Sequence, residues 1–205
     1  MSSRVQKEKA AQFRRFHHEA PLLVLPNVWD AASARIVAQA GFPAIATTSS
    51  GVAAALGYSD GQQISRDMMI DAIARITRVV ECPVTADIEA GYGNSIEEVL
   101  QTVKAVITTG VVGINIEDSL KQQEKALVDI SYQVELIKAL RELATSIDVP
   151  FVINARVDVF YWQLVSQRAA SSMRCREPMP ICKRGRIVSI PSVDSIATRL
   201  PTWSR

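Results

Sequence analysis

The sequence predicts an α/β protein of the TIM (β/α)8-barrel type, incomplete, with about five βα units recognisable. Short apolar runs alternate with helical patterns, which is typical of repeated βα units around a parallel sheet. Charged side chains follow several of the runs, at the end of the strands where barrel enzymes keep their active sites. No GxGxxG motif follows the first run and no Walker A motif occurs. This absence disfavours the alternative, an open doubly wound sheet that binds nucleotides.

Five apolar runs are the predicted strands. Their lengths suit buried parallel strands, and proline, glycine or polar residues bound them. In chain order they cover residues 22–25, 44–48, 83–87, 113–117 and 150–155.

Between the strands, apolar residues recur at helical spacing. Asp30 suits the N-cap of the first helix and Ser95 that of the third, while Gly110 suits the end of the third. The predicted helices cover residues 31–40, 67–80, 95–109 and 131–146. The glycine-containing segment 49–65 is expected to be a long loop.

The charge of the chain is unevenly distributed. The formal net charge is +2 over 205 residues. Residues 1–160 hold 15 Lys and Arg against 19 Asp and Glu, whereas residues 161–205 hold 8 against 2. We therefore divide the chain into an N-terminal part of a barrel, residues 1–160, and a basic tail of atypical composition, residues 161–205.

Several classes of protein are disfavoured by composition. No apolar run of 18 residues occurs and no apolar segment follows the basic N-terminus, so neither membrane insertion nor secretion is expected. Three widely spaced cysteines suit a reducing, cytoplasmic setting. His17 and His18 stand alone in a polar helix, which disfavours zinc. The basic tail lacks an aromatic stacking motif, so a nucleic-acid partner is not expected.

Carboxylates follow two neighbouring predicted strands. Asp87 and Glu89 end the third strand and Glu117 ends the fourth. Such oxygen ligands suit Mg²⁺, and a cation between them would offset their mutual repulsion. The alternative is that these carboxylates cap helices or pair with arginine.

Two further sites suit an anionic ligand. Arg156 ends the fifth strand with a planar guanidinium that matches a carboxylate or phosphate. Its alternative role is a salt bridge to Asp158 or Glu117. Ser50 and Gly51 follow the second strand and could offer backbone N–H groups to an anion, although Ser-Gly is also a common turn.

Together, these segments resemble the isocitrate lyase and phosphoenolpyruvate mutase superfamily, in its phosphonomutase-like and oxaloacetate decarboxylase-like branch. The resemblance covers about residues 10–160. It is carried by PNVWDA (26–31), TSSG (48–51), LGYSD (56–60), ADIEAGYGN (86–94), NIED (115–118) and NARVD (154–158).

The resemblance implies a barrel enzyme that binds Mg²⁺ and a small anionic 2-oxo acid or phosphonopyruvate-type substrate. It implies that Asp87 contacts Mg²⁺ directly while Glu89 and Glu117 hold it through water. Ser50 and Gly51 would bind the substrate carboxylate. The implied catalytic residues are Asp60, at the lip of a gating loop, and Arg156, which balances the anionic substrate. The site residues that the resemblance implies are therefore Ser50, Gly51, Asp60, Asp87, Glu89, Glu117 and Arg156.

The chain departs from the superfamily after the fourth strand. Lyase members carry a Lys-Lys-Cys-Gly-His loop with a catalytic cysteine, and this chain has SLKQQEKAL over 119–127 instead. Isocitrate and methylisocitrate lyase activities are therefore disfavoured. Lys121 and Lys125 are candidates to replace the lysine of the mutase lid, or are simply solvated.

The tail does not resemble the superfamily. Three explanations compete: a reading-frame shift near residues 160–165, a shortened paralogue with a new basic arm, and a misplaced gene boundary. Superfamily members form tetramers that exchange a C-terminal helix, and no matching helix is recognisable here, so a homo-oligomer lacks support from the tail.

Two functions are expected. The first is a Mg²⁺-dependent lyase or mutase that acts on a C–C or P–C bond through a metal-stabilised enolate. The alternative is a truncated, catalytically inactive member that acts as a binding or assembly partner, because an open five-strand arc leaves an edge unpaired.

Overall fold

The computed structural model describes residues 4–19, 22–119 and 126–158. These residues form a parallel five-stranded sheet in which each strand pairs with the next along the chain. The strands are β1 (Asn27–Val28), β2 (Ile45–Thr47), β3 (Val84–Asp87), β4 (Gly113–Glu117) and β5 (Val152–Arg156). The predicted α/β fold with repeated βα units is confirmed, and all five carboxyl ends meet on one side of the sheet.

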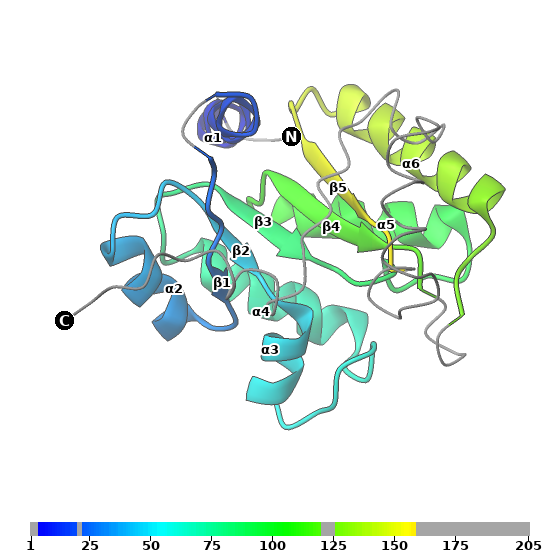
Figure 1. Ribbon diagram of the computed structural model, residues 1–205, viewed down its shortest axis with the longest axis horizontal. Coiled ribbons are helices and arrows are strands. Elements are labelled where there is room, and N and C mark those ends of the chain that lie inside the picture. Colours follow the sequence, from blue (N-terminus) through cyan, green and yellow to red (C-terminus); the bar gives the residue numbers. More distant parts are fainter. Residues whose placement is uncertain (1–3, 20–21, 120–125, 159–205) are drawn as a thin grey trace, which may run out of the picture.

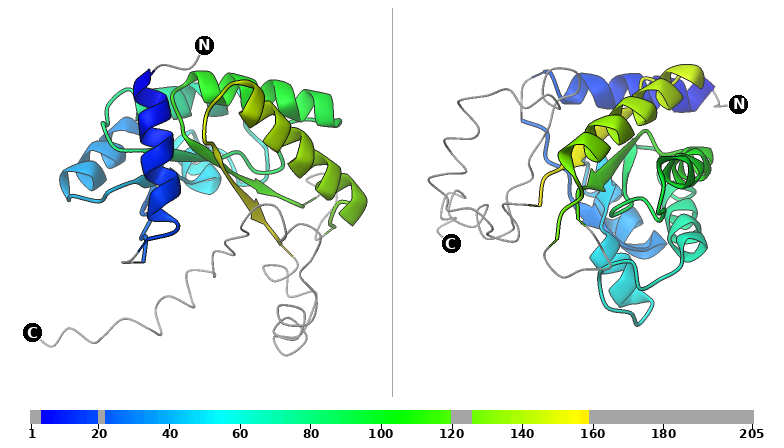
Figure 2. Two further views of the ribbon diagram at one scale, coloured as in Figure 1. Left: turned by 90° about the horizontal axis from the view of Figure 1, so that it is seen from above. Right: turned by 90° about the vertical axis from the view of Figure 1, so that its right-hand side faces the viewer.

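Six helices accompany the sheet in the described residues. They are α1 (Arg4–Phe16), α2 (Ala31–Gln39), α3 (Ser49–Ala55), α4 (Arg66–Thr77), α5 (Ile96–Thr108) and α6 (Ile130–Ser146). Figure 2 shows α5 and α6 beside each other on the outer face of the sheet, and these two helices are in contact. Alternate strand residues, such as Ile114 and Ile116, join the helices in the hydrophobic core. None of the described helices is long and apolar enough to cross a bilayer.

The predicted helix caps are present. Asp30 accepts a hydrogen bond from the N–H of Ser33 (2.7 Å), and the Ser33 hydroxyl accepts one from the N–H of Asp30 (3.1 Å), which completes a capping box. Ser95 accepts a hydrogen bond from the N–H of Glu98 at the start of α5 (3.3 Å). The sequence alone predicts these caps, because each hydrogen bond joins residues that are three apart in the chain.

Two predicted elements are wrong. The first strand is not at 22–25 but at Asn27–Val28, where the carbonyl of Pro26 accepts a hydrogen bond from the N–H of Ala46 (3.0 Å). Leu22 is 89% exposed, so this apolar run lies outside the core. The predicted loop 49–65 begins with helix α3, whose N-cap is Thr48. The other boundaries differ by no more than three residues, and His17 and His18 follow the end of α1.

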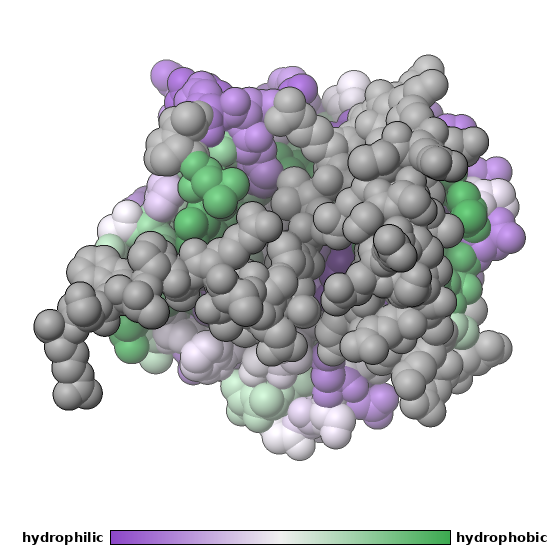
Figure 3. All heavy atoms as spheres, in the orientation of Figure 1, coloured by the Kyte–Doolittle hydropathy of each residue, from purple (hydrophilic) through white to green (hydrophobic). Residues whose placement is uncertain are grey.

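Helix α1 packs against the amino ends of β4 and β5. Phe13 is 1% exposed, and a Cβ added at Gly113 would lie 3.1 Å from its ring. The Gln6 amide donates to the carbonyls of Ile107 (2.8 Å) and Val111 (2.9 Å). Hydrophilic side chains gather on the outer side of α1, at the top of Figure 3. The predicted site residues stand at the opposite side of the sheet, at the carboxyl ends of the strands.

The strand register places polar side chains in rows across the sheet. Asp87 pairs with Asn115, which in turn pairs with Asn154, and Glu117 pairs with Arg156. Paired residues in a parallel sheet point to the same face. The described face opposite the helix-covered one is therefore polar toward the carboxyl ends, where the predicted site residues lie.

Candidate active site

Asp87 ends β3, and its carboxylate is held by the segment that follows β2. Its Oδ2 accepts hydrogen bonds from the backbone N–H of Ser49 (3.1 Å) and from the Ser49 hydroxyl (2.8 Å). The N–H of Asp87 donates to Oγ1 of Thr47 (2.8 Å). Asp87 is only 8% exposed, so these donors replace the water that would otherwise solvate the carboxylate.

Glu89 lies just beyond β3 in a left-handed backbone conformation, with φ of 52°. Its N–H donates to Oδ1 of Asp87 (3.2 Å), and its Oε1 accepts a hydrogen bond from the Tyr92 hydroxyl (3.0 Å). Burial raises the pKa of the Glu89 carboxyl to about 7. The charges of Asp60 and Asp87 act in the same direction, and the hydrogen bond from Tyr92 opposes them. Glu89 therefore exchanges its proton near neutral pH.

Arg156 joins the ends of β4 and β5. It forms an ion pair with Glu117, its partner in the strand register. It also binds Asp158 in a bidentate manner, with Nε 2.6 Å from Oδ1 and Nη2 2.9 Å from Oδ2. Both salt bridges that the sequence left open as the alternative role of Arg156 are thus confirmed.

Asp118 and Asp158 fasten the beginning of the loop after β4. The N–H of Asp158 donates to Oδ1 of Asp118 (2.8 Å), and the Ser119 hydroxyl donates to Oδ2 of Asp158. The carbonyl of Asp118 accepts a hydrogen bond from the N–H of Val128 (2.8 Å). Burial raises the pKa of Asp118, and the charge of Asp158 adds to this. The beginning of this loop is therefore held by Asp158, which follows β5, and its end is held by Asp118, while Lys121 and Lys125 lie outside the described residues.

The sequence that forms this sheet and its helices matches a known protein family. The family model for phosphoenolpyruvate phosphomutase matches residues 13–177. This chain belongs to the phosphoenolpyruvate phosphomutase family. The resemblance that the motifs predict is confirmed, and the match continues past residue 160 into the segment of basic composition.

Relatives of known name and structure agree with the family. The 2-methylisocitrate lyase of Escherichia coli is 35% identical over 147 residues, covering 68% of this chain and 49% of that enzyme. A candidate phosphonomutase from Burkholderia cenocepacia is 40% identical with a TM-score of 0.78, covering 87% of this chain and 72% of that one. A 2,3-dimethylmalate lyase of the same superfamily is 28% identical with a TM-score of 0.69, covering 81% and 58%. The described sheet thus belongs to a superfamily of βα barrels.

The chain spans about half the length of the curated relatives it matches. The described five strands correspondingly form an arc and not a closed barrel. Residues 159–205 lie outside the described part, so the division of the chain at residue 160 and the separate character of the tail stay predictions.

The predicted metal ligands of this phosphomutase-family chain do not form one cluster. Across 4–19, 22–119 and 126–158, no three His, Cys, Asp or Glu side chains are arranged to share an ion. Asp87 and Glu89 adjoin, whereas Glu117 pairs with Arg156. Asp87 and Glu89 still suit Mg²⁺, because both offer carboxylate oxygens. The charge of Asp87 helps to raise the pKa of Glu89, and a cation between the two carboxylates would relieve this repulsion. Glu117 could add an oxygen to this pair only by sharing its carboxylate between the ion and Arg156, or by leaving Arg156.

The predicted anion-binding segment begins helix α3. The Ser50 hydroxyl lies 3.0 Å from Oγ1 of Thr48, and the N–H of Gly51 donates to the same atom at 3.4 Å. A Cβ at Gly51 would lie 2.6 Å from Cγ2 of Thr48 and 3.1 Å from Cβ of Trp29. Close packing is therefore a sufficient reason for glycine at 51, and Ser50 is the exposed member of the pair.

Asp60 lies in the loop between α3 and α4 and is exposed. Its charge raises the pKa of Glu89, and the backbone of Gln62 hydrogen-bonds to Glu89. The structure thus places the Asp60 loop beside Glu89, and the role of Asp60 stays a prediction.

Sequence reasoning missed the residues that hold the carboxylates. Thr47 and Ser49 contact Asp87, Tyr92 contacts Glu89, and Ser119 contacts Asp158. The end of β2 lies beside the end of β3, so the polar residues after the second predicted strand could have been considered as partners of Asp87. Tyr92 and Ser119 carried no comparable signal.

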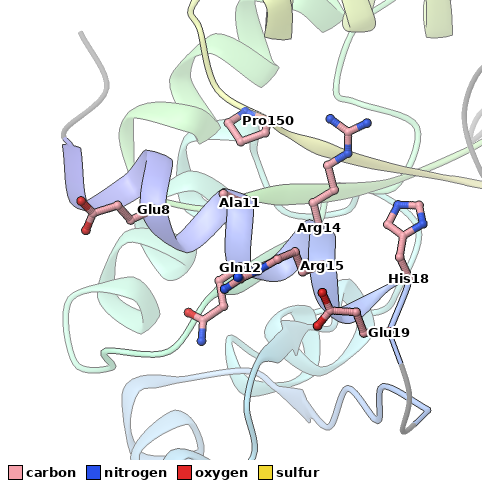
Figure 4. Close-up of a pocket in the computed structure, with 8 residues that line it drawn as sticks. All are labelled: Glu8, Ala11, Gln12, Arg14, Arg15, His18, Glu19 and Pro150. Carbon is pink, nitrogen blue, oxygen red and sulfur yellow. The ribbon is translucent and has the colours of Figure 1, made fainter.

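A separate open cavity of about 710 Å³ lies away from these carboxylates. Figure 4 shows it between Pro150, next to the amino end of β5, and the outer side of α1 with the residues after it. Its lining residues are Glu8, Ala11, Gln12, Arg14, Arg15, His18, Glu19 and Pro150. None of them is a predicted site residue, and the carboxyl ends of the strands remain the candidate active site.

Proposed function

We propose that this chain carries the metal-binding part of a Mg²⁺-dependent lyase or mutase that acts on a C–C or P–C bond of a small anionic 2-oxo acid. The observation that carries the proposal is the buried Asp87–Glu89 pair at the carboxyl end of β3, beside the exposed Asp60. Burying several negative charges together is costly without a counter-charge. A bound cation would supply that charge, and the family motif and the position of the pair at the carboxyl ends of the strands support this location.

The three carboxylates would hold the ion in two ways, directly and through water. Asp87 would bind it directly, and Glu89 and Glu117 would hold it through water. The bound cation would stabilise negative charge that builds on a substrate oxygen as the neighbouring bond breaks, by way of an enolate. Because the Glu89 pKa lies at about 7, Glu89 would give up its proton readily when positive charge is placed beside it.

The substrate would be held by residues from the other strand ends. Ser50 and Gly51 would bind the substrate carboxylate at the start of α3. Arg156 would balance the charge of the anion, and Asp60 would border the substrate from the exposed loop. Since Arg156 already pairs with Glu117, an arriving anion would compete with Glu117 for the guanidinium and free that carboxylate to face the ion.

The test is consumption of oxaloacetate and of phosphonopyruvate with Mg²⁺ and with a chelator, for the wild type and for Asp87→Ala. The expected result is turnover that needs Mg²⁺ and is lost in the variant, together with Mg²⁺ binding by calorimetry in the wild type alone. Asp71→Ala is the matched control, because Asp71 forms an exposed ion pair with Arg75 on α4. A wild type that neither binds Mg²⁺ nor consumes substrate contradicts the proposal and leaves the non-catalytic alternative.

A further inference from the structure

The Asp87 carboxylate presents its two oxygens differently. Oδ2 accepts two hydrogen bonds from Ser49, one from the N–H at 3.1 Å and one from the hydroxyl at 2.8 Å. Oδ1 accepts one, from the N–H of Glu89 at 3.2 Å. An ionised carboxylate offers about four lone-pair positions. Within the described residues, these three donors leave one position, and it is on Oδ1.

We propose that Ser49 is a positioning residue: it occupies Oδ2 of Asp87 and so presents Oδ1 as the single oxygen through which Asp87 binds a divalent cation. This inference rests on the proposed function, because it assigns the ion to Asp87. It adds that the contact is monodentate and that the Ser49 hydroxyl sets the orientation of the carboxylate.

Burial makes this hydrogen bond effective. Ser49 is 5% exposed and Asp87 is 8% exposed, so water competes little for the carboxylate. A hydrogen bond from a hydroxyl to an ionised carboxylate is stronger than one between neutral groups. The backbone of Asp87 is fixed from the same side, since its N–H donates to Thr47 at 2.8 Å. The junction of β2 and α3 therefore holds both the main chain and the side chain of Asp87.

Ser49→Ala separates the hydroxyl from the backbone N–H, because it removes only the first. Groups that orient a metal ligand typically contribute 10–100-fold to metal affinity. The expected result is an increase of about 10-fold in the Mg²⁺ dissociation constant, measured by calorimetry on the full chain. The same change is expected for Mn²⁺, followed by the loss of the free-ion signal in electron paramagnetic resonance.

Ser65→Ala is the matched control. Ser65 caps α4 by accepting a hydrogen bond from the N–H of Met68 (3.2 Å), and its loss destabilises the helix without touching Asp87. Its Mg²⁺ affinity is expected to equal that of the wild type. Ser49→Thr retains a hydroxyl and is expected to bind Mg²⁺ within about threefold of the wild type, which also covers the case in which Ser49→Ala does not fold.

Each outcome has a distinct meaning. Wild-type affinity in Ser49→Ala, or affinity as poor in Ser49→Thr as in Ser49→Ala, overturns the positioning role and leaves the proposed function intact. An equal loss in Ser65→Ala assigns the effect to stability and also overturns it. A wild type without Mg²⁺ affinity overturns both the positioning role and the proposed function.

Discussion

Glu117 and Arg156 are register partners on β4 and β5 and form an ion pair across the carboxyl end of the sheet. Asp158 binds the same guanidinium through two hydrogen bonds. One arginine therefore compensates two carboxylates that are 3% and 0% exposed. Arg156 therefore stabilises this end of the sheet and is also the residue that we propose to balance the charge of the substrate.

Arg156→Ala is expected to lower the free energy of unfolding by about 3–5 kcal/mol, because it leaves Glu117 and Asp158 buried without their counter-charge. Urea unfolding followed by circular dichroism measures this loss. Arg75→Ala is the control, since Arg75 pairs with Asp71 on the surface of α4, and its effect should stay below about 1 kcal/mol. Equal losses in the two variants would show that the β4–β5 ion pair contributes no more to stability than the surface pair on α4.

Glu89 is expected to make the metal-free protein less stable as the pH rises. Its pKa is about 7 in the folded chain and about 4.3 when unfolded. Between these values the folded state keeps a proton that the unfolded state has released, so stability falls as pH increases through this window. Above pH 7 the penalty is constant, and below about pH 4 it is absent.

Glu89→Gln removes this titration. The variant should gain stability relative to the wild type between pH 5 and pH 8, measured by urea unfolding in the presence of a chelator. Glu142→Gln, at an exposed position on α6, should show the same difference from the wild type at both pH values. A pH-independent difference for Glu89→Gln would contradict the raised pKa.

Asp60→Asn should move the same titration to lower pH, because the charge of Asp60 raises the pKa of Glu89. The wild type and the variant are compared by the pH at which unfolding stability stops falling, because the folded-state pKa of Glu89 sets that upper limit. Asp67→Asn, also an exposed aspartate but on α4, should leave that pH unchanged. No displacement in Asp60→Asn would mean that Asp60 and Glu89 are not electrostatically coupled.

Gly91→Ala should be more destabilising than Gly41→Ala. Both glycines have positive φ, 93° and 87°, so both variants carry the backbone cost of a side chain in that region. Only at Gly91 would the new Cβ meet a neighbour, Cγ1 of Val99 at 2.6 Å, whereas nothing lies within 4 Å at Gly41. The excess is expected to be about 1–3 kcal/mol in urea unfolding, and equal losses would refute the close approach of the β3 loop to α5.

Local signals in the sequence determined most of the fold. The caps at Asp30 and Ser95 and the order of the five strands follow from local preferences and periodicity. The prediction of a strand at 22–25 is wrong, because an apolar run becomes a buried strand only where a neighbouring strand can pair with it. The pairing of Ala46 with Pro26 and Asn27 decided where β1 lies.

For the site, the sequence is enough to identify the chemical groups and the strand ends at which they stand. Asp87, Glu89, Glu117 and Arg156 could be selected because the carboxyl ends of parallel strands converge. The pairing of these groups is visible only in the folded chain: Asp87 with Ser49, Glu89 with Tyr92, and Glu117 with Arg156. Burial requires each of these charges to have a partner within a few ångströms. Tyr92 is three residues from Glu89, but Ser49 and Arg156 come from segments that are distant in the chain from Asp87 and Glu117.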